Sequence, residues 1–152
     1  MTNVSLGDSS PSPSLVQASG NTVVATKVVD AARLHFLPRV FGPGHMMLGE
    51  TAVYRWMSEL CPEYHGGFWD FIDLSNGGFY LRLVCAAPVH LVVDGNGFDA
   101  EMSNDAASIV ASLFALNTLA WNGAEHLVDA YYLLKDFAMD HPQGQLILRA
   151  ID

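Results

Sequence analysis

Three side chains within five residues, Cys61, Glu63 and His65, are of the types that a thiol hydrolase uses. In such an enzyme a histidine takes the proton of the cysteine and a third group orients the histidine, so the side chains must lie within hydrogen-bond distance. Here Cys61 is expected to end a helix and His65 to begin a loop, and this spacing does not bring them together. A thiol-dependent small hydrolase using Cys61 and His65 is therefore kept only as the alternative function.

The remaining residues predict neither a metal site nor a cofactor site. The chain has six histidines, at positions 35, 45, 65, 90, 126 and 141. No two of them have the HxH, HExxH or i,i+4 spacing that places two imidazoles on one metal ion. Gly95-Asn96-Gly97 is too short for a phosphate-binding loop and leads into a strand-like segment. Cys61 and Cys85 have no zinc-like CxxC spacing and are expected as reduced, buried thiols, because no export signal is visible.

The charge of the chain disfavours direct binding to DNA. There are 16 acidic and seven basic residues among 152, which gives a net charge of −9. Acidic side chains gather between Pro62 and Asp105, where Arg82 is the single base. Such a surface repels the phosphates of a duplex. Imitation of DNA is also disfavoured, since about ten base pairs carry on the order of 20 phosphates, more than all the carboxylates of this chain.

The chain is expected to contain one domain after a short tail. Residues 1–21 are rich in serine and show no apolar period, which predicts a flexible tail, and residues 22–152 form the domain. No apolar run approaches the roughly 18 residues that a membrane span requires. The first residues also lack the basic and apolar segments of an export signal. A cytoplasmic protein without membrane contact is therefore expected.

In the first half of the domain, two helices and a hairpin are predicted. Asp30 is expected to cap a short helix that ends near Leu37, because a residue before proline avoids the helical conformation. A second helix is expected from about residue 45 to 61. Asn76-Gly77 then predicts a hairpin with a type I′ turn, in which both central residues have a positive φ.

The second half predicts more strands and an antiparallel pair of helices. A third strand, at about residues 89–93, is continuously apolar and therefore expected at the centre of a sheet. After a tight turn, Ser103 is a good N-cap for a long helix that Asn122-Gly123 ends. Another helix is expected from about residue 124 to 139. The fold class is α+β: a small antiparallel sheet with hairpin turns, packed against several helices in a single domain.

Four segments of the chain also resemble a known family. They read, in order, FLPRVFG (36–42), EYHGGFWDFIDLSNGGFY (63–80), GNGF (95–98) and MSNDAASIVASLFAL (102–116). Together they resemble the ArdB/KlcA antirestriction proteins, which are carried on plasmids and other mobile elements, and the similarity extends over about residues 27–152. The resemblance implies a non-enzymatic protein that blocks type I restriction–modification of incoming DNA in a bacterial host.

The aromatic hairpin is the expected contact surface for a partner. Alternation along residues 68–73 places apolar side chains on both faces of the strand, so either one face binds a partner or helices cover both faces. The partner implied by the resemblance is the host restriction–modification complex, reached directly or through an indirect effect. The residues proposed for the contact are Arg39, Trp69, Asp70, Asp73 and Arg82.

Overall fold

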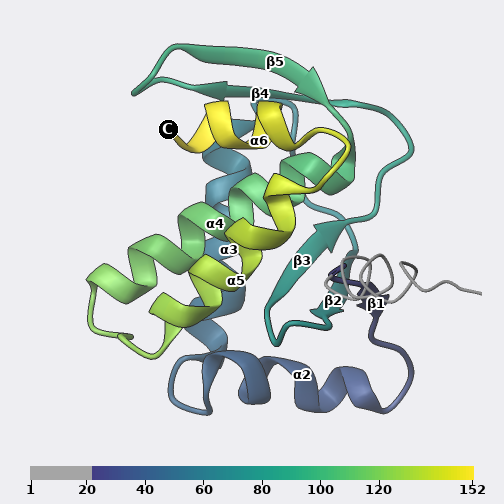
Figure 1. Cartoon of the computed structure of the whole chain (residues 1–152), viewed down its shortest axis with the longest axis vertical. Helices are drawn as coiled ribbons and strands as arrows, with labels where there is room; N and C mark the ends of the chain where they lie inside the picture. Colours follow the sequence, from purple (N-terminus) through teal and green to yellow (C-terminus); the bar gives the residue numbers. More distant parts are fainter. Residues whose placement is uncertain (1–21) are drawn as a thin grey trace, which may run out of the picture.

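The computed structural model describes residues 22–152, so the tail expected at residues 1–21 lies outside the described residues. Its helices are α2 (Ala32–Phe41), α3 (Met46–Leu60), α4 (Asn104–Trp121), α5 (Leu127–Met139) and α6 (Gly144–Ile151). Its strands are β1 (Ala25–Lys27), β2 (Trp69–Leu74), β3 (Phe79–Leu83), β4 (Val89–Val93) and β5 (Phe98–Met102). The α+β class and the antiparallel pairing are confirmed (Figure 1).

The strands form two small sheets rather than one. The first sheet has the order β1-β2-β3 and the second pairs β4 with β5, both antiparallel. The prediction that residues 89–93 form a central strand is therefore wrong. The apolar run of β4 arises because Val89 and Leu91 are buried on the face that packs against helices α3 and α4. Strand β1, only three residues long, was not predicted.

The hairpin lies where it was expected, but its turn is not type I′. The amide of Gly77 donates to the carbonyl of Leu74 at 3.0 Å, so Ser75 and Asn76 are the central residues. Gly77 has a φ of +95°, whereas Asn76 is not among the residues with a positive φ. Asn76 acts through its side chain, which accepts from Gly78 at 2.8 Å and donates to the carbonyl of Leu133 in α5 at 3.0 Å. A tertiary contact thus fixes this turn.

Helix α2 differs from its prediction at both ends. Asp30 does not cap it: Ala31 occupies the N-cap position, and Asp30 has a φ of +53°. The helix also continues through Pro38 to Phe41, because Phe36 and Phe41 are both fully buried and keep the chain against the sheet. The amide that Pro38 lacks would have bonded to Leu34, which is an exposed residue where water can take its place.

Helix α2 packs on one face of the first sheet, and α5 contacts part of the other face. On one side Phe36 of α2 stacks on Phe71 with ring centroids 4.6 Å apart, and Phe41 meets Phe79 edge-on at 5.2 Å. On the other face Tyr80 stacks on Phe137 of α5, with ring centroids 6.0 Å apart. The central helix α4, most of whose residues are buried, packs along the edge of β3. An α-helix that is apolar nearly all round is expected inside a protein.

Helix α4 also completes the hydrogen bonds of the free edge of β3. Its residues Asn104, Ser108 and Ser112 are four apart and so lie along one line of the helix. Ser108 and Ser112 accept from the amides of Leu83 and Leu81 at 2.9 and 3.3 Å. Asn104 donates to the carbonyl of Leu83 at 2.7 Å. Four residues of a helix rise about 6 Å and two residues of a strand about 6.7 Å, so side chains four apart on α4 can meet alternate residues of β3.

The C-terminal helices pack on α4. Ser103 caps α4 as expected, accepting from the amide of Ala106 at 3.0 Å, and α4 and α5 form the predicted antiparallel pair. Residues 144–151 form the short helix α6. The side chain of Asn96, in the turn between β4 and β5, donates to the carbonyl of Ala150 at 2.9 Å. None of the described helices is both long and apolar enough to cross a membrane.

Candidate functional site

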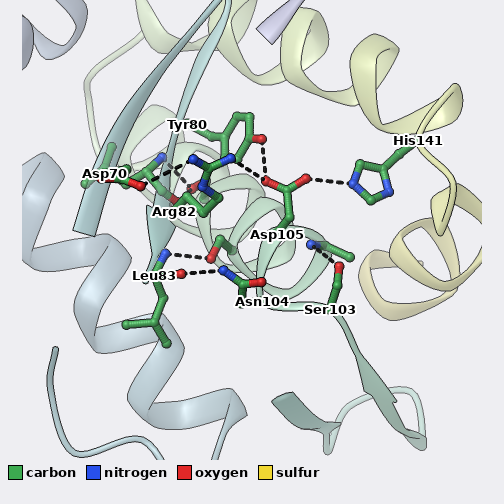
Figure 2. A network of polar contacts seen from close by, with 12 residues as sticks. Asp70, Tyr80, Arg82, Leu83, Ser103, Asn104, Asp105 and His141 are labelled. Atoms are coloured by element: carbon green, nitrogen blue, oxygen red, sulfur yellow. Dashed lines mark hydrogen bonds and ion pairs between the residues drawn. The ribbon is translucent and has the colours of Figure 1, made fainter. Parts of the chain in front are cut away.

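A network of five polar side chains joins the first sheet to the C-terminal helices (Figure 2). Asp70 lies on β2, Tyr80 and Arg82 lie on β3, Asp105 lies in the first turn of α4, and His141 lies between α5 and α6. The alternation of β2 and β3 directs Asp70, Tyr80 and Arg82 toward α4, away from the face covered by α2. The network therefore collects residues from four separate parts of the chain.

Asp105 is the centre of this network. The Tyr80 hydroxyl donates to its Oδ1 at 2.7 Å, and Nη1 of Arg82 lies 3.5 Å from the same oxygen. Nε2 of His141 lies 2.7 Å from Oδ2. Arg82 also reaches Asp70, with Nη2 3.3 Å from Oδ2 of that carboxylate. One arginine thus stands between two carboxylates.

The electrostatics of the network favour an ionised Asp105. Burial raises the pKa of its carboxyl, but the hydrogen bonds from His141 and Tyr80 and the charge of Arg82 outweigh this, so the pKa lies below its ordinary value. Burial and the bond to Asp105 raise the pKa of the Tyr80 hydroxyl, which therefore stays protonated and donates. Burial lowers the pKa of Arg82, but the hydrogen bond to Asp70 and the charges around the guanidinium, among them Asp105, together outweigh it, so the pKa is raised.

The position of His141 is fixed by both ring nitrogens. The amide of Gln143 donates to Nδ1 at 2.9 Å, which makes this nitrogen an acceptor. In the neutral ring the proton therefore lies on Nε2 and is donated to Asp105. Gln143 in turn accepts from the amide of Ser103, the N-cap of α4, at 2.8 Å. With both nitrogens engaged and the side chain nearly buried, His141 has no free position to act as a base.

The surface beside the network is a shallow depression of about 400 Å³ lined by Asp70, Arg82, Cys85 and Asp105 among others. Chemically, the arrangement can hold four elements in register, because each charge already has a partner inside the protein. A catalytic site needs a group whose hydrogen bond is left for the substrate. The role of the network is therefore best described as structural: it holds the sheet, α4 and the turn before α6 together.

The residues of the hydrolase alternative do not form a catalytic pair. Cys61 is buried, with 5% of its surface exposed, whereas His65 is exposed. Both border a depression of about 290 Å³, together with Glu63 and Cys85. The expectation that both thiols are buried is wrong for Cys85, which is exposed. Among the hydrogen bonds of residues 22–152, none joins Cys61 to His65. The geometry gives the hydrolase no support.

The five residues proposed to contact a partner do not form one surface in the structure. Trp69 is 3% exposed and donates to the hydroxyl of Tyr64 at 3.1 Å, so its ring is not available as a contact. Asp70 and Arg82 belong to the network. Arg39 and Asp73 form an exposed ion pair at 2.9 Å between α2 and β2. Only this pair, of the five, lies on the open surface.

Nothing in the sequence marks Tyr80, Asp105 and His141 as members of one site. Asp105 was noted only as the last residue of an acidic segment, and His141 as one histidine among several. Tyr80 and His141 are 25 and 36 residues away from Asp105, which is too far for a local sequence pattern to connect them. One local signal exists: His141 stands beside Pro142 and Gly144, residues typical of a turn, and a turn could hold its imidazole ring in one position.

Comparison with known proteins defines the class. The model of the antirestriction protein family matches residues 62–152. Antirestriction protein KlcA of Escherichia coli is 50% identical over 137 residues, which cover 86% of this chain and 94% of that protein. The uncharacterized protein YfjX of Escherichia coli strain K12 is 36% identical over 145 residues, covering 91% and 95%. The chain therefore belongs to the antirestriction protein family.

A solved structure places the fold within the same group. It comes from work on the KlcA and ArdB proteins, which is described as showing a novel fold and antirestriction activity against type I DNA restriction systems in vivo but not in vitro. The TM-score is 0.81 and the sequence identity 48%, covering 86% of this chain and 95% of that chain. The resemblance to ArdB/KlcA is thereby confirmed.

Proposed function

We propose that this protein blocks type I restriction–modification of incoming DNA inside a bacterial host and that it does so without catalysing a reaction. The observation that carries the proposal is the similarity to KlcA over nearly the whole of both chains, in sequence and in fold. Restriction of incoming DNA takes place in the cytoplasm, so we place the protein there. A mobile element that enters a restricting cell gains from carrying such a protein.

The arrangement of charges supports a mechanism other than DNA mimicry. A mimic needs carboxylates that stand free at phosphate-like spacing. Three of the acids on the hairpin side, Asp70, Asp73 and Asp105, are paired with Arg82 or Arg39. These carboxylates are neutralised within the protein and cannot present an uncompensated row of charge. We also propose that the protein does not bind duplex DNA stably, because its net charge is −9.

The proposal includes a cellular component beyond the purified restriction enzyme. The relatives with a solved structure are active in vivo but not in vitro. If this chain behaves in the same way, the restriction complex is reached indirectly, through a host factor that a purified reaction lacks. Arg39 and Asp73 remain proposed contacts for that partner, since both are exposed and belong to different elements.

The test is a restriction assay in cells and with purified components. Unmodified phage is plated on a strain with an active type I system, with and without the protein. We expect the plating efficiency to rise by at least about tenfold when the protein is expressed, while cleavage by the purified enzyme is unchanged. Equal plating in both strains, at confirmed expression of folded protein, would contradict the proposal. Inhibition of the purified enzyme would replace the indirect mechanism by a direct one.

A further inference from the structure

The turn between α4 and α5 carries an exposed aromatic groove of about 450 Å³. It is lined by Trp121, Tyr131, Tyr132 and Val128 together with Asn117 and Glu125. Trp121 is 83% exposed and Tyr132 58% exposed, so two large rings stand largely in water. Aromatic side chains left exposed around a groove are characteristic of protein-binding surfaces.

This groove is remote from the polar network. Asp105 lies in the first turn of α4 and Trp121 ends this helix, and a helix of 18 residues is about 27 Å long. Figure 1 shows the turn between α4 and α5 at the opposite end of α4 from the sheets. The turn does adjoin α2, because Nε2 of His126 lies 2.8 Å from the carbonyl oxygen of Phe41. A large partner could therefore contact both the groove and the end of α2 that carries Arg39.

Three features of the groove favour a positive charge. The faces of Trp121 and Tyr132 are negative, and a guanidinium or ammonium group is attracted to them. Glu125 is the one charged residue among the described residues that line the groove, and it is acidic. The groove also lies at the C-terminus of α4, the negative end of its dipole, where the last turn has no basic side chain to compensate.

We propose that this groove binds an arginine or lysine side chain of a basic segment on a partner protein. The inference rests on the proposed function only in identifying that partner with the host component through which restriction is blocked. The side chain of the partner lies between Trp121 and Tyr132 and pairs with Glu125. No base of this chain competes for the same position among the residues that line the groove.

Binding is tested with a probe of defined chemistry. A blocked peptide that alternates glycine and arginine is titrated into ¹⁵N-labelled protein, and a second peptide replaces each arginine by citrulline, which keeps the shape and removes the charge. The chain has three tryptophans, and the indole N–H signal of Trp121 is assigned by its absence in Trp121→Ala. We expect a saturable shift of this signal with the arginine peptide alone, weakening as salt is raised.

Matched variants separate the groove from general charge attraction. Glu125→Lys and Asp94→Lys change the net charge equally, but Asp94 lies in the exposed turn between β4 and β5. We expect Glu125→Lys to weaken peptide binding at least about fivefold and Asp94→Lys to leave it nearly unchanged. Equal weakening in both variants would overturn the proposal, as would shifts confined to signals outside the groove. Dimerisation that Trp121→Ala abolishes would make a second copy of the chain the occupant and would overturn it too.

The restriction assay then connects the groove to function. Trp121→Ala and Glu125→Lys are expected to lose restriction blocking while keeping the melting temperature, because both side chains are exposed. Met139→Ala, an exposed apolar residue at the other end of α5, is the control and should block restriction normally. If the unaltered protein fails to block restriction, the proposed function fails. If it blocks restriction and both groove variants do so equally well, the function stands and the groove inference is wrong.

Discussion

The hydroxyl oxygen of Ser108 accepts a hydrogen bond from the backbone amide of Leu83 at 2.9 Å in the interior of the protein. Strand β3 is the edge of its sheet, so this amide has no partner strand. The side chain of the central helix takes the place of that strand. A buried amide without a partner is costly, and α4 thereby makes the sheet edge compatible with burial.

Ser108→Ala is expected to lower the free energy of unfolding by about 1–3 kcal/mol, because the amide of Leu83 stays buried and loses its acceptor. Urea unfolding followed by circular dichroism measures this change. Ser58→Ala, an exposed serine of α3, is the control and should have almost no effect. A loss of the same size in both variants would show that the hydrogen bond to Leu83 is not responsible.

The pH dependence of stability should depend on Asp105. Its pKa is lower in the folded protein than in the unfolded chain. The stability that its ionised form contributes is therefore complete above the unfolded pKa, about 4, and is lost as the pH falls through the lower folded value. Asp105→Asn should be less stable at pH 6 and should lose less stability between pH 5 and 2.5. Parallel stability curves for the two proteins would contradict this.

Gly77→Ala is expected to destabilise the protein by about 1–2 kcal/mol, because a residue with a Cβ resists the left-handed conformation. The φ of Gly77 is +95°, and a Cβ there would lie 3.8 Å from Leu133, an ordinary contact. The cost is thus one of backbone conformation rather than of space. Gly44→Ala is the matched control, since no atom lies within 4 Å and φ is not positive. The melting temperatures of both variants decide the comparison.

Cys61→Ala and His65→Ala should both retain restriction blocking in cells. Cys61 packs in the core, so its variant is expected to be somewhat less stable, whereas the exposed His65 should tolerate the change. Circular dichroism establishes that each variant is folded at the assay temperature. Loss of blocking in a variant that remains folded would restore the thiol hydrolase as a function.

Arg39→Ala and Asp73→Ala test the hairpin side of the contact surface. An exposed ion pair contributes about 0–1 kcal/mol, so neither change should unfold the protein. If the pair contacts the partner, each variant lowers restriction blocking several-fold at unchanged expression. Glu59→Ala, on the exposed side of α3, serves as the control. Normal blocking by both variants would confine the contact to other surfaces.

Much of the secondary structure could be predicted because its signals are local. Ser103 caps α4 through a side chain three residues from the amide that it binds, and Gly123 ends the helix with a φ of +113°. The hairpin at residues 76–77 and the helix at residues 45–61 also follow from residues that are neighbours in the chain. The family resemblance came from the sequence alone as well, since it rests on the order of four short segments.

The tertiary structure decided the features that depend on distant partners. Pro38 lies inside a helix because buried phenylalanines on either side of it pack on the sheet. Asn76 sits in a different turn because its amide group binds the carbonyl of Leu133, 57 residues away. Trp69 was proposed as a contact because it is aromatic and on a hairpin, and the helices that bury it are not visible in its neighbours.

The candidate site shows the same division most clearly. Ser108 and Ser112 interrupt an apolar stretch in the sequence, and their spacing of four residues is visible there. The sequence does not tell that the line they form faces the unpaired edge of β3. Periodicity identifies a face of a helix but not what lies against that face. The bonds from Tyr80 and His141 to Asp105 likewise exist only once four elements have packed. Local residues determined where helices and turns form, and packing determined which polar groups meet.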